Sequence, residues 1–426
     1  MSDQKLTANQ VRGFWAAWAG WALDGMDSFI YALVLVPALR ELLPRSGIAG
    51  GQDNVGFYGG LLFAVFLVGW GFAFLWGPIA DRFGRVRTLM LTILCYSLFT
   101  FLGAVASDVW QLAIFRFFAG AGIGGEWTLG GVFVAEEWPE SRRQKGAAYM
   151  HTGYYFGTFL AAIVNYTIGA HYGWRAVFAV GGAPALLVAF IRYSVTEPHR
   201  WRTRMRELGE QLTARRAFLA LFSQEYRRRT LVSATLLFIS MVGLWAGSVY
   251  VPSSVTYLAS NEGLSTAQAA RLASYATMLL SAGTILGCLL LPWLADTFGR
   301  RSALAFYFVL MLIFISLGFG YVFYLRQDAL MWFFVCLFFL GVGGANFAVY
   351  TLWLPEQYRT ECRGSAFAFA TSFGRFLAAG VTFLVGAGVA HYRTIGTPVA
   401  LTSLAFLVGL FLLPWGEETK GKELPA

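Results

Sequence analysis

The chain has 426 residues, of which 57% are hydrophobic and only 13% are charged, and its formal net charge is +9. Soluble proteins average about 25% charged residues, so this chain has too few charges to cover a water-facing surface of its size. The mean hydropathy of +0.58 agrees with that conclusion. The composition excludes an ordinary soluble enzyme and a disordered protein, and it predicts a chain that lies mostly in lipid.

Apolar runs of membrane-spanning length follow one another along the chain. A transmembrane helix needs about 20 mainly apolar residues, and these runs are far too long for barrel strands. They predict an all-α integral membrane protein with twelve transmembrane helices. The runs are Phe14–Leu39, Phe57–Ala80, Val86–Ala106, Trp110–Val134, Gly146–His171, Trp174–Tyr193, Leu231–Leu258, Arg271–Leu294, Ser302–Leu325, Ala329–Leu354, Gly364–His391 and Ile395–Trp415.

The basic residues predict the orientation of these helices. Of the 32 Lys and Arg residues, 24 fall on the side that holds both termini and the central loop, and six fall on the other side. By the positive-inside rule, we expect both termini and the central loop to be cytoplasmic, with the chain in the inner (plasma) membrane. No loop is long enough for a basic nucleic-acid-binding domain, so no nucleic-acid partner is expected.

The chain divides into two similar halves. We expect an N-terminal six-helix bundle at residues 1–193, a cytoplasmic linker at 194–229, and a C-terminal six-helix bundle with a short tail at 230–426. The sequence ADRFGR at Ala80–Arg85 recurs as ADTFGR at Ala295–Arg300, each time after the second span of its half. Such internal repetition is typical of transporters built from two pseudo-symmetric bundles.

A second short motif also recurs in the two halves. The sequence PESRR at Pro139–Arg143 follows the fourth span, and PEQYR at Pro355–Arg359 follows the tenth. Together with GPIADRFGRVR at residues 77–87, these motifs resemble the cytoplasmic loop signatures of the major facilitator superfamily. The resemblance covers nearly the whole chain and implies two bundles that rock about a central site.

The resemblance also implies a cytoplasmic gate. The residues that would lock it are Asp81 and Arg85 in the first half and Asp296 and Arg300 in the second. Thr297 stands where the motif usually has Arg, so we expect the second lock to be weaker. The alternative is that the arginines only hold their loops in the cytoplasm.

Five ionisable residues lie deep within the predicted spans. Each costs about 3 kcal/mol or more in lipid unless it is paired or hydrated, so a functional role is the first hypothesis. They are Asp24 and Asp27 in span 1, Arg116 and Glu126 in span 4, and Arg375 in span 11.

The carboxylates among them are candidates for proton coupling. Asp24 and Asp27 are three residues apart and share one helix face near the middle of their span. We expect Asp27 to be the main proton carrier, with Asp24 and Glu126 as further sites, while Arg116 favours the ionised form of Asp27. The alternative is a fixed Asp27–Arg116 strut between spans 1 and 4.

Arg375 is the candidate for binding an anionic substrate. No acidic residue lies at its depth in spans 7 to 12, and a guanidinium presents a planar fork that matches a carboxylate. The alternative is that it pairs with an acidic residue of the first bundle. Polar and aromatic residues at helical spacing are expected to complete the substrate site: Trp127, Tyr154, Asn346 and Tyr350.

Two further stretches sharpen the expected function. WALDGMD at Trp21–Asp27 resembles span 1 of aromatic-acid/proton symporters, and RFFAGAGIGGEW at Arg116–Trp127 resembles span 4 of metabolite, sialate/lactate and phosphate symporters. The resemblance implies a proton-coupled symporter that imports a small organic anion, such as a monocarboxylate, aromatic acid or sialate-like acid. The alternatives are a sugar or neutral-solute symporter and a proton-driven multidrug exporter. We expect no enzyme activity, cofactor or metal, and a functional monomer.

Overall fold

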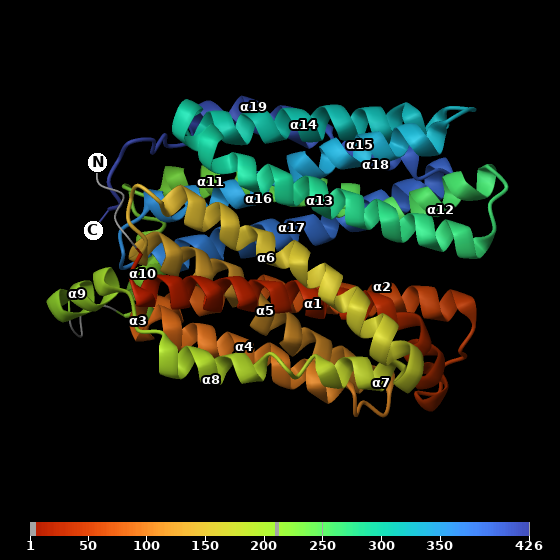
Figure 1. Cartoon of the computed structure of the whole chain (residues 1–426), viewed down its shortest axis with the longest axis horizontal. Helices are drawn as coiled ribbons and strands as arrows, with labels where there is room; N and C mark the ends of the chain where they lie inside the picture. Colours follow the sequence, from red (N-terminus) through yellow and green to blue (C-terminus); the bar gives the residue numbers. More distant parts are fainter. Residues whose placement is uncertain (1–5, 209–212, 249, 426) are drawn as a thin grey trace.

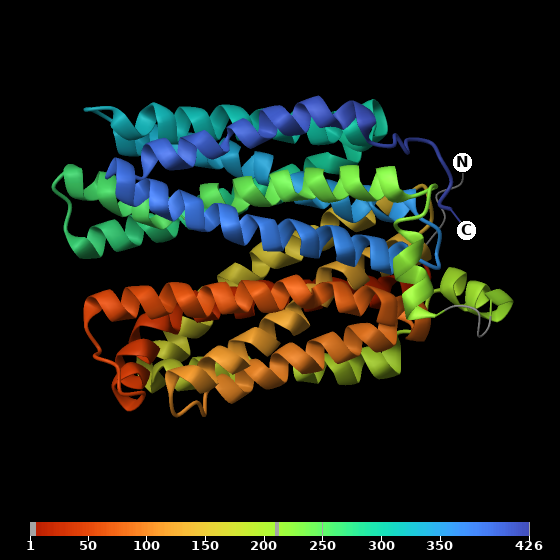
Figure 2. The same cartoon turned by 180° about the vertical axis from the view of Figure 1, so that it is seen from behind.

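The computed structural model of the chain describes residues 6–208, 213–248 and 250–425, and no residue in these ranges lies in a strand. The helices run along the long axis of the molecule and form two bundles that lie side by side (Figures 1 and 2). Both chain ends lie at one end of the molecule (Figure 1), here called the termini end; the other is the opposite end.

The first bundle holds six membrane-length segments, and several of them contain more than one helix. A turn at Gly173, where φ is 77°, separates the fifth segment from the sixth within α7. The helices are α1 (Ala8–Arg45); α2 (Gln52–Gly71) with η1 (Phe72–Leu75) and α3 (Trp76–Phe83); α4 (Arg85–Gly103); α5 (Val109–Glu137); α6 (Arg143–Val164) with η2 (Asn165–Gly169); and α7 (Ala170–Val180) with α8 (Ala185–Ser194).

The second bundle repeats this arrangement after two short helices, α9 (His199–Leu208) and α10 (Ala214–Ala220), which lie at the termini end (Figure 1). Its segments are α11 (Arg227–Ser248) with α12 (Val251–Asn261); α13 (Thr266–Phe298); α14 (Arg300–Gly320) with η4 (Val322–Tyr324); α15 (Ala329–Gly344) with α16 (Asn346–Trp353) and η5 (Pro355–Gln357); α17 (Arg363–Tyr392); and α18 (Gly396–Thr402) with α19 (Leu404–Leu412) and η6 (Leu413–Trp415).

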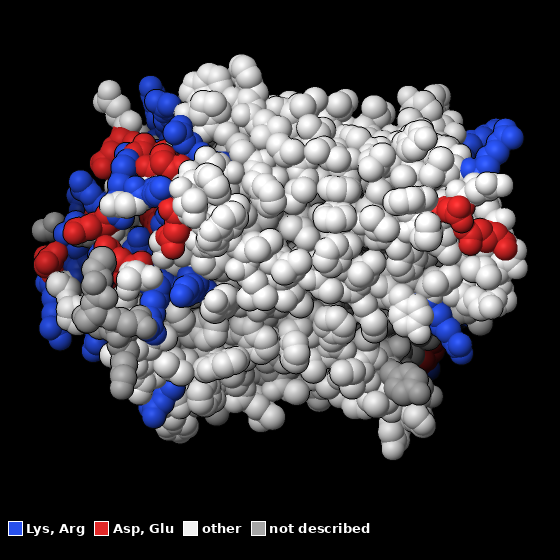
Figure 3. Space-filling model, turned by 45° about the horizontal axis from the view of Figure 1, so that its top comes forward, with Lys and Arg blue, Asp and Glu red and all other residues white. Residues whose placement is uncertain are grey.

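Length and hydropathy alone identify six membrane spans among the described residues, or seven if α1, bent by 65° at Pro37, counts as one. Figure 3 shows the charged side chains gathered at the two ends, with a broad band free of them between. This band is where hydrocarbon can cover the surface.

Two tight turns at the termini end have the same geometry in the two bundles. Gly84 and Gly299 have φ values of 115° and 91°, which side chains other than hydrogen rarely allow. Each turn joins the second segment of its bundle to the third and brings the following arginine, Arg85 or Arg300, back toward the bundle interface. The recurring ADxFGR sequence therefore builds the same corner twice.

Candidate functional site

A cavity of about 460 Å³ lies between the two bundles. Its lining residues on α1, α2 and α6 extend from near the middle of these segments toward the opposite end. One wall is aromatic and the other carries hydroxyl groups. The aromatic wall comes from α1 and α2 and includes Phe29, Tyr31, Phe63, Phe66 and Trp70.

Arg375 lies directly against this aromatic wall. Its guanidinium carbon is 4.2 Å from the ring centroid of Trp70, the lining residue of α2 nearest the termini end, and 5.9 Å from that of Trp127. Arg375 is 5% exposed, and its Nη1 atom has no hydrogen-bond partner among the described residues. Arg375 is not itself among the residues that line the cavity. It is a buried cation, stacked on the lining residue Trp70, with a free donor.

Two carboxylates without a cationic partner lie in the first bundle beside this cation. Asp24 on α1 and Glu126 on α5 are completely buried. Neither oxygen of Asp24 has a hydrogen-bond partner in the described part of the chain, and Asp24 interacts electrostatically with Glu126, Asp27 and Arg375. Glu126 Oε2 accepts a long bond of 3.4 Å from Thr92.

Gly20 makes room for the Glu126 carboxylate. A Cβ atom at Gly20 would lie only 1.8 Å from Glu126 Oε1. The close approach of α1 and α5 at this point lets Glu126 reach the helix face that carries Asp24.

The third buried carboxylate is paired. Arg116 Nη1 lies 3.4 Å from Asp27 Oδ2, and both side chains are fully buried. The guanidinium also stacks on Phe66 at 4.2 Å and on Tyr31 at 4.6 Å from the ring centroids. This geometry is the Asp27–Arg116 pair that the sequence suggested, and it joins α1 to α5.

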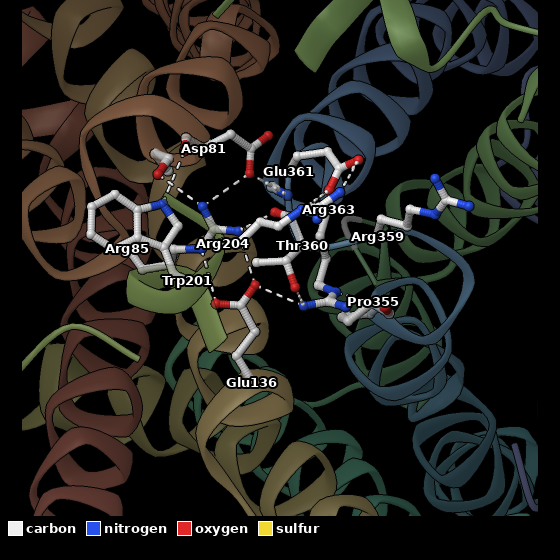
Figure 4. A network of polar contacts seen from close by, with 12 residues as sticks. Asp81, Arg85, Glu136, Trp201, Arg204, Pro355, Arg359, Thr360, Glu361 and Arg363 are labelled. Carbon is white, nitrogen blue, oxygen red and sulfur yellow. Dashed lines mark hydrogen bonds and ion pairs between the residues drawn. The ribbon is translucent and has the colours of Figure 1, made fainter. Parts of the chain in front are cut away.

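A buried network at the termini end joins the two bundles, as Figure 4 shows. Asp81 of α3 accepts bonds from the backbone of Gly364 at 3.1 Å and of Ser365 at 2.8 Å, and from the Ser365 hydroxyl at 2.6 Å. It therefore caps the first turn of α17 in the other bundle, where the helix dipole favours a negative charge. Arg85 Nη1 holds the same carboxylate at 3.1 Å.

Glu136, in the last turn of α5, extends this network. Its Oε1 atom lies 2.9 Å from Arg85 Nη2 and 2.8 Å from Arg363 Nη1. Figure 4 shows the two arginines approaching Glu136 from opposite bundles. One carboxylate thus holds a cation from each bundle.

The second half contains the equivalent arrangement. Glu356 Oε1 lies 2.9 Å from Arg300 Nη2 in its own bundle and 3.0 Å from Arg143 Nη2 in the other. The two Arg–Glu–Arg bridges are related by the pseudo-symmetry of the halves. They close the termini end on both sides of the interface.

Comparison with known proteins identifies the family. The model of the Major Facilitator Superfamily matches residues 17–383. The chain belongs to the major facilitator superfamily. It is 31% identical to the probable 4-methylmuconolactone transporter of Cupriavidus pinatubonensis over 97% of this chain and 91% of that protein. It is 28% identical to the niacin transporter NiaP of Acinetobacter baylyi over 96% and 94%.

A solved structure shows the same fold. The proton:xylose symporter XylE, bound to 6-bromo-6-deoxy-D-glucose, superposes with a TM-score of 0.78 over 98% of both chains at 20% identity. The expected fold of twelve transmembrane helices in two six-helix bundles is therefore confirmed. Because the family and these relatives are membrane transporters, this superfamily member is a multi-pass transporter and not an enzyme.

Of the substrate residues expected from sequence, the structure places only Tyr154 in the cavity lining of the transporter. Asn346 is buried and donates to Gly343 O at 2.9 Å. Tyr350 is buried with its hydroxyl 3.0 Å from Ser240 Oγ. In this conformation both lie within the second bundle, outside the cavity lining.

Trp127 lies in an aromatic layer beneath the cavity. Its ring stacks on Trp21 at 5.7 Å and meets Phe367 of the other bundle at 5.2 Å between centroids. Its Nε1 donates to Thr351 Oγ1 at 2.8 Å, which again crosses the bundle interface. The layer separates the cavity from the charged network.

Asp296 does not repeat the burial of Asp81. Asp81 is completely buried, whereas Asp296 is exposed and accepts one bond, at 2.8 Å, from Gln144 of the other bundle. Whether the second lock is weaker, as the Thr297 position predicts, stays a prediction.

Sequence reasoning missed Glu136 and Arg363. It aligned Glu140 with Glu356, but Glu140 is half-exposed and the residue that matches Glu356 in space is Glu136. The number of residues between Glu136 and Glu356 equals the number between Arg143 and Arg363. This equal offset is the sequence signal that could have identified both residues.

The linker also takes part in the polar network at the termini end. Trp201 of α9 donates to Asp81 O at 2.9 Å, and Arg204 binds Glu361 of the other bundle at 2.8 Å. No contact of this linker with the recurring motifs of the two halves was predicted from the sequence.

Proposed function

We propose that this transporter is a proton-coupled symporter that imports a small organic anion by alternating access. It acts as a monomer in the inner membrane, with the termini end in the cytoplasm because most basic residues lie there. The relatives are named for 4-methylmuconolactone and niacin, and these names support an organic acid as the substrate of this transporter. The finer choice among monocarboxylates, aromatic acids and sialate-like acids is left to the substrate screen below.

The observation that carries the proposal is the free cation at the cavity wall. The acidic residues of the second bundle all lie at its two ends, so Arg375 has no counter-charge in its own bundle at its depth. A buried, unpaired charge is costly. A substrate carboxylate that enters from the cavity would neutralise it and use its free Nη1 donor.

The same cation links substrate binding to proton uptake. Asp24 is the first-bundle carboxylate that interacts electrostatically with Arg375, and it interacts with Glu126 as well. When a substrate anion neutralises Arg375, the influence of that cation on Asp24 is offset, and Asp24 binds a proton, shared with Glu126. Sequence reasoning put Asp27 first for this role, but its pairing with Arg116 makes Asp24 and Glu126 the better carriers.

Release to the cytoplasm requires the termini end to open. The contacts that must break are those of Asp81 with α17 and the two Arg–Glu–Arg bridges centred on Glu136 and Glu356. Because α17 carries both Arg375 and the helix end that Asp81 caps, movement of α17 connects the central site to the gate. In this account Asp81, Arg85, Asp296 and Arg300 are gate residues.

Arg375 variants test the proposal directly. We expect Arg375→Gln to abolish uptake of organic anions into proteoliposomes, and Arg375→Lys to retain weak uptake because it keeps the charge but loses the fork. Arg326→Gln, which removes an exposed arginine at the opposite end, is the matched control and should transport normally. Unchanged anion affinity in Arg375→Gln would refute the role, and uptake of neutral sugars alone would favour the sugar-symporter alternative.

A further inference from the structure

The wall of the cavity that faces the aromatic residues carries a row of hydroxyl groups. Thr277, Ser281 and Thr284 of α13 all line the cavity. Their spacing of four and three residues places them one above another on a single helix face. No role in transport has been given to this row so far.

The hydrogen bonds of the row decide what it can bind. Thr277 Oγ1 donates to Ala273 O at 3.0 Å, and Thr284 Oγ1 donates to Leu280 O at 3.0 Å. A hydroxyl has one hydrogen and two lone pairs, so both threonines have spent their donor on their own helix. What they offer to the cavity is an acceptor.

Within the row, Thr277 and Ser281 are the available positions. Thr284 already interacts with the side chain of Tyr155 on α6, so it is more engaged than the other two. Thr277 and Ser281 lie one helical turn apart, nearer the opposite end than Thr284.

The row and Arg375 lie at different seams between the bundles. Arg375 and Trp70 belong to α17 and α2, which pack together, and the hydroxyl row belongs to α13, which packs against α6. Figure 1 shows α6 and α13 in front, whereas α17 comes to the front in the reversed view of Figure 2. A ligand held at both places spans the cavity, with its body against the aromatic wall.

We infer that Thr277 and Ser281 form a second polar subsite that accepts a hydrogen bond from the substrate end remote from its carboxylate. The preferred substrate is then a flat, unsaturated or ring-bearing carboxylate with a hydroxyl or N–H donor at its far end. This inference rests on the proposed function, because it takes Arg375 as the carboxylate site.

The test compares three ligands that share one carboxylate. Benzoate, hydroxybenzoates and methoxybenzoates differ at the far end in having no polar group, a donor, or only an acceptor. Their affinities are measured by counterflow in proteoliposomes that hold the full-length protein. We expect the hydroxybenzoates to bind about two- to tenfold more tightly than the other two, the range of one hydrogen bond.

The variants Thr277→Val and Ser281→Ala, singly and together, should remove this preference and leave benzoate affinity unchanged. Thr382→Val is the matched control, since Thr382 Oγ1 makes the same bond to its own helix, to Ala378 O at 2.9 Å, outside the cavity lining. The proposed subsite is refuted if the double variant still prefers hydroxybenzoates, or if the wild type shows no such preference. If none of the three carboxylates is bound but another organic acid is transported, the inference of a flat, ring-bearing substrate is wrong and the proposed function stands. If no organic acid is transported at all, the proposed function itself fails.

Discussion

Three carboxylates are buried between α1 and α5, and they differ in what surrounds them. Asp27 has Arg116 at 3.4 Å, whereas Asp24 and Glu126 have no ion pair among the described residues. Removing one partner of an ion pair in a dry interior strongly destabilises the folded protein, because the other charge stays buried and unpaired. An unpaired carboxylate is instead accommodated by a proton, so the two kinds of site should respond differently to mutation.

The first prediction concerns Asp24→Asn, which mimics the protonated carboxyl and keeps its size. We expect the variant to exchange substrate across the membrane at no proton gradient but to lose accumulation against the substrate gradient. Counterflow and uphill uptake in the same proteoliposomes measure the two activities. Uphill accumulation at the wild-type level would remove Asp24 from the coupling mechanism.

The second prediction concerns the Asp27–Arg116 pair. Asp27→Asn leaves a buried guanidinium without its counter-charge, so we expect a loss of about 3–5 kcal/mol in stability. The double variant Asp27→Asn with Arg116→Leu should recover much of it, which thermal unfolding in detergent can measure. Equal stability of the single variant and the wild type would contradict a structural role for the pair.

The third prediction concerns Gly20→Ala. The new methyl group would meet the end of the Glu126 side chain, which can rotate away, so the change displaces the carboxylate rather than the helix. We expect uptake to fall several-fold with little change in melting temperature. Gly380→Ala is the control, because a Cβ at Gly380 has no neighbour within 4 Å; if both variants transport alike, the position of Glu126 does not matter.

The sequence was most informative where a single residue differs in polarity from the residues around it. Asp24, Glu126 and Arg375 stand out because each is an ionisable residue within an apolar run. Asn346 and Tyr350 carry no such contrast, and their neighbours within the second bundle decide that they lie outside the cavity lining in this conformation. Helix packing decides which charges pair. The spacing of residues within one segment does not specify that packing.

At the scale of helices, the end of α5 explains why Glu136 was overlooked. Pro139-Glu140 and Pro355-Glu356 occupy equivalent positions in the sequence motif. However, Pro139 follows α5, which ends at Glu137, whereas Pro355 begins η5. The same carboxylate position is therefore built from the last turn of a helix in one half and from a 3₁₀ turn in the other.

Asp81 and Asp296 give the fourth prediction, because the structure makes them unequal. Asp81 is a buried cap of α17 with four donors around it, and Asp296 is exposed with one. A hydrogen bond to a charged group contributes about 1.5–3 kcal/mol, and each 1.4 kcal/mol is about tenfold in an equilibrium. We expect Asp81→Asn to favour opening of the termini end by about tenfold or more, and Asp296→Asn to have little effect.

Cys362 is a natural reporter for this opening. It precedes α17 within the gate, it is 1% exposed, and burial raises the pKa of its thiol. In a background that lacks Cys95, Cys288 and Cys336, a maleimide should label Cys362 faster in Asp81→Asn than in Asp296→Asn. Equal labelling rates in the two variants would show that Asp81 does not hold the gate.

For the whole molecule, the twelve spans and the two bundles followed from the sequence because lipid imposes a simple length and composition rule. The conformation did not follow, since both states of an alternating-access transporter use the same helices. The structure adds that the termini end is closed by two Arg–Glu–Arg bridges and an aromatic layer, with the cavity beyond them. In the proposed import cycle, this state is the one in which the substrate enters before the termini end opens.

The central claim is that an organic anion and a proton move together, and substrate-induced proton flux in proteoliposomes tests it most directly. Short monocarboxylates, aromatic acids, sialic acid and neutral sugars are added outside in turn, with an external pH indicator. The account predicts alkalinisation of the outside medium with one class of acid, lost in both Arg375→Gln and Asp24→Asn. Transport of the acid without any pH change, or a pH change with neutral sugars alone, would contradict it.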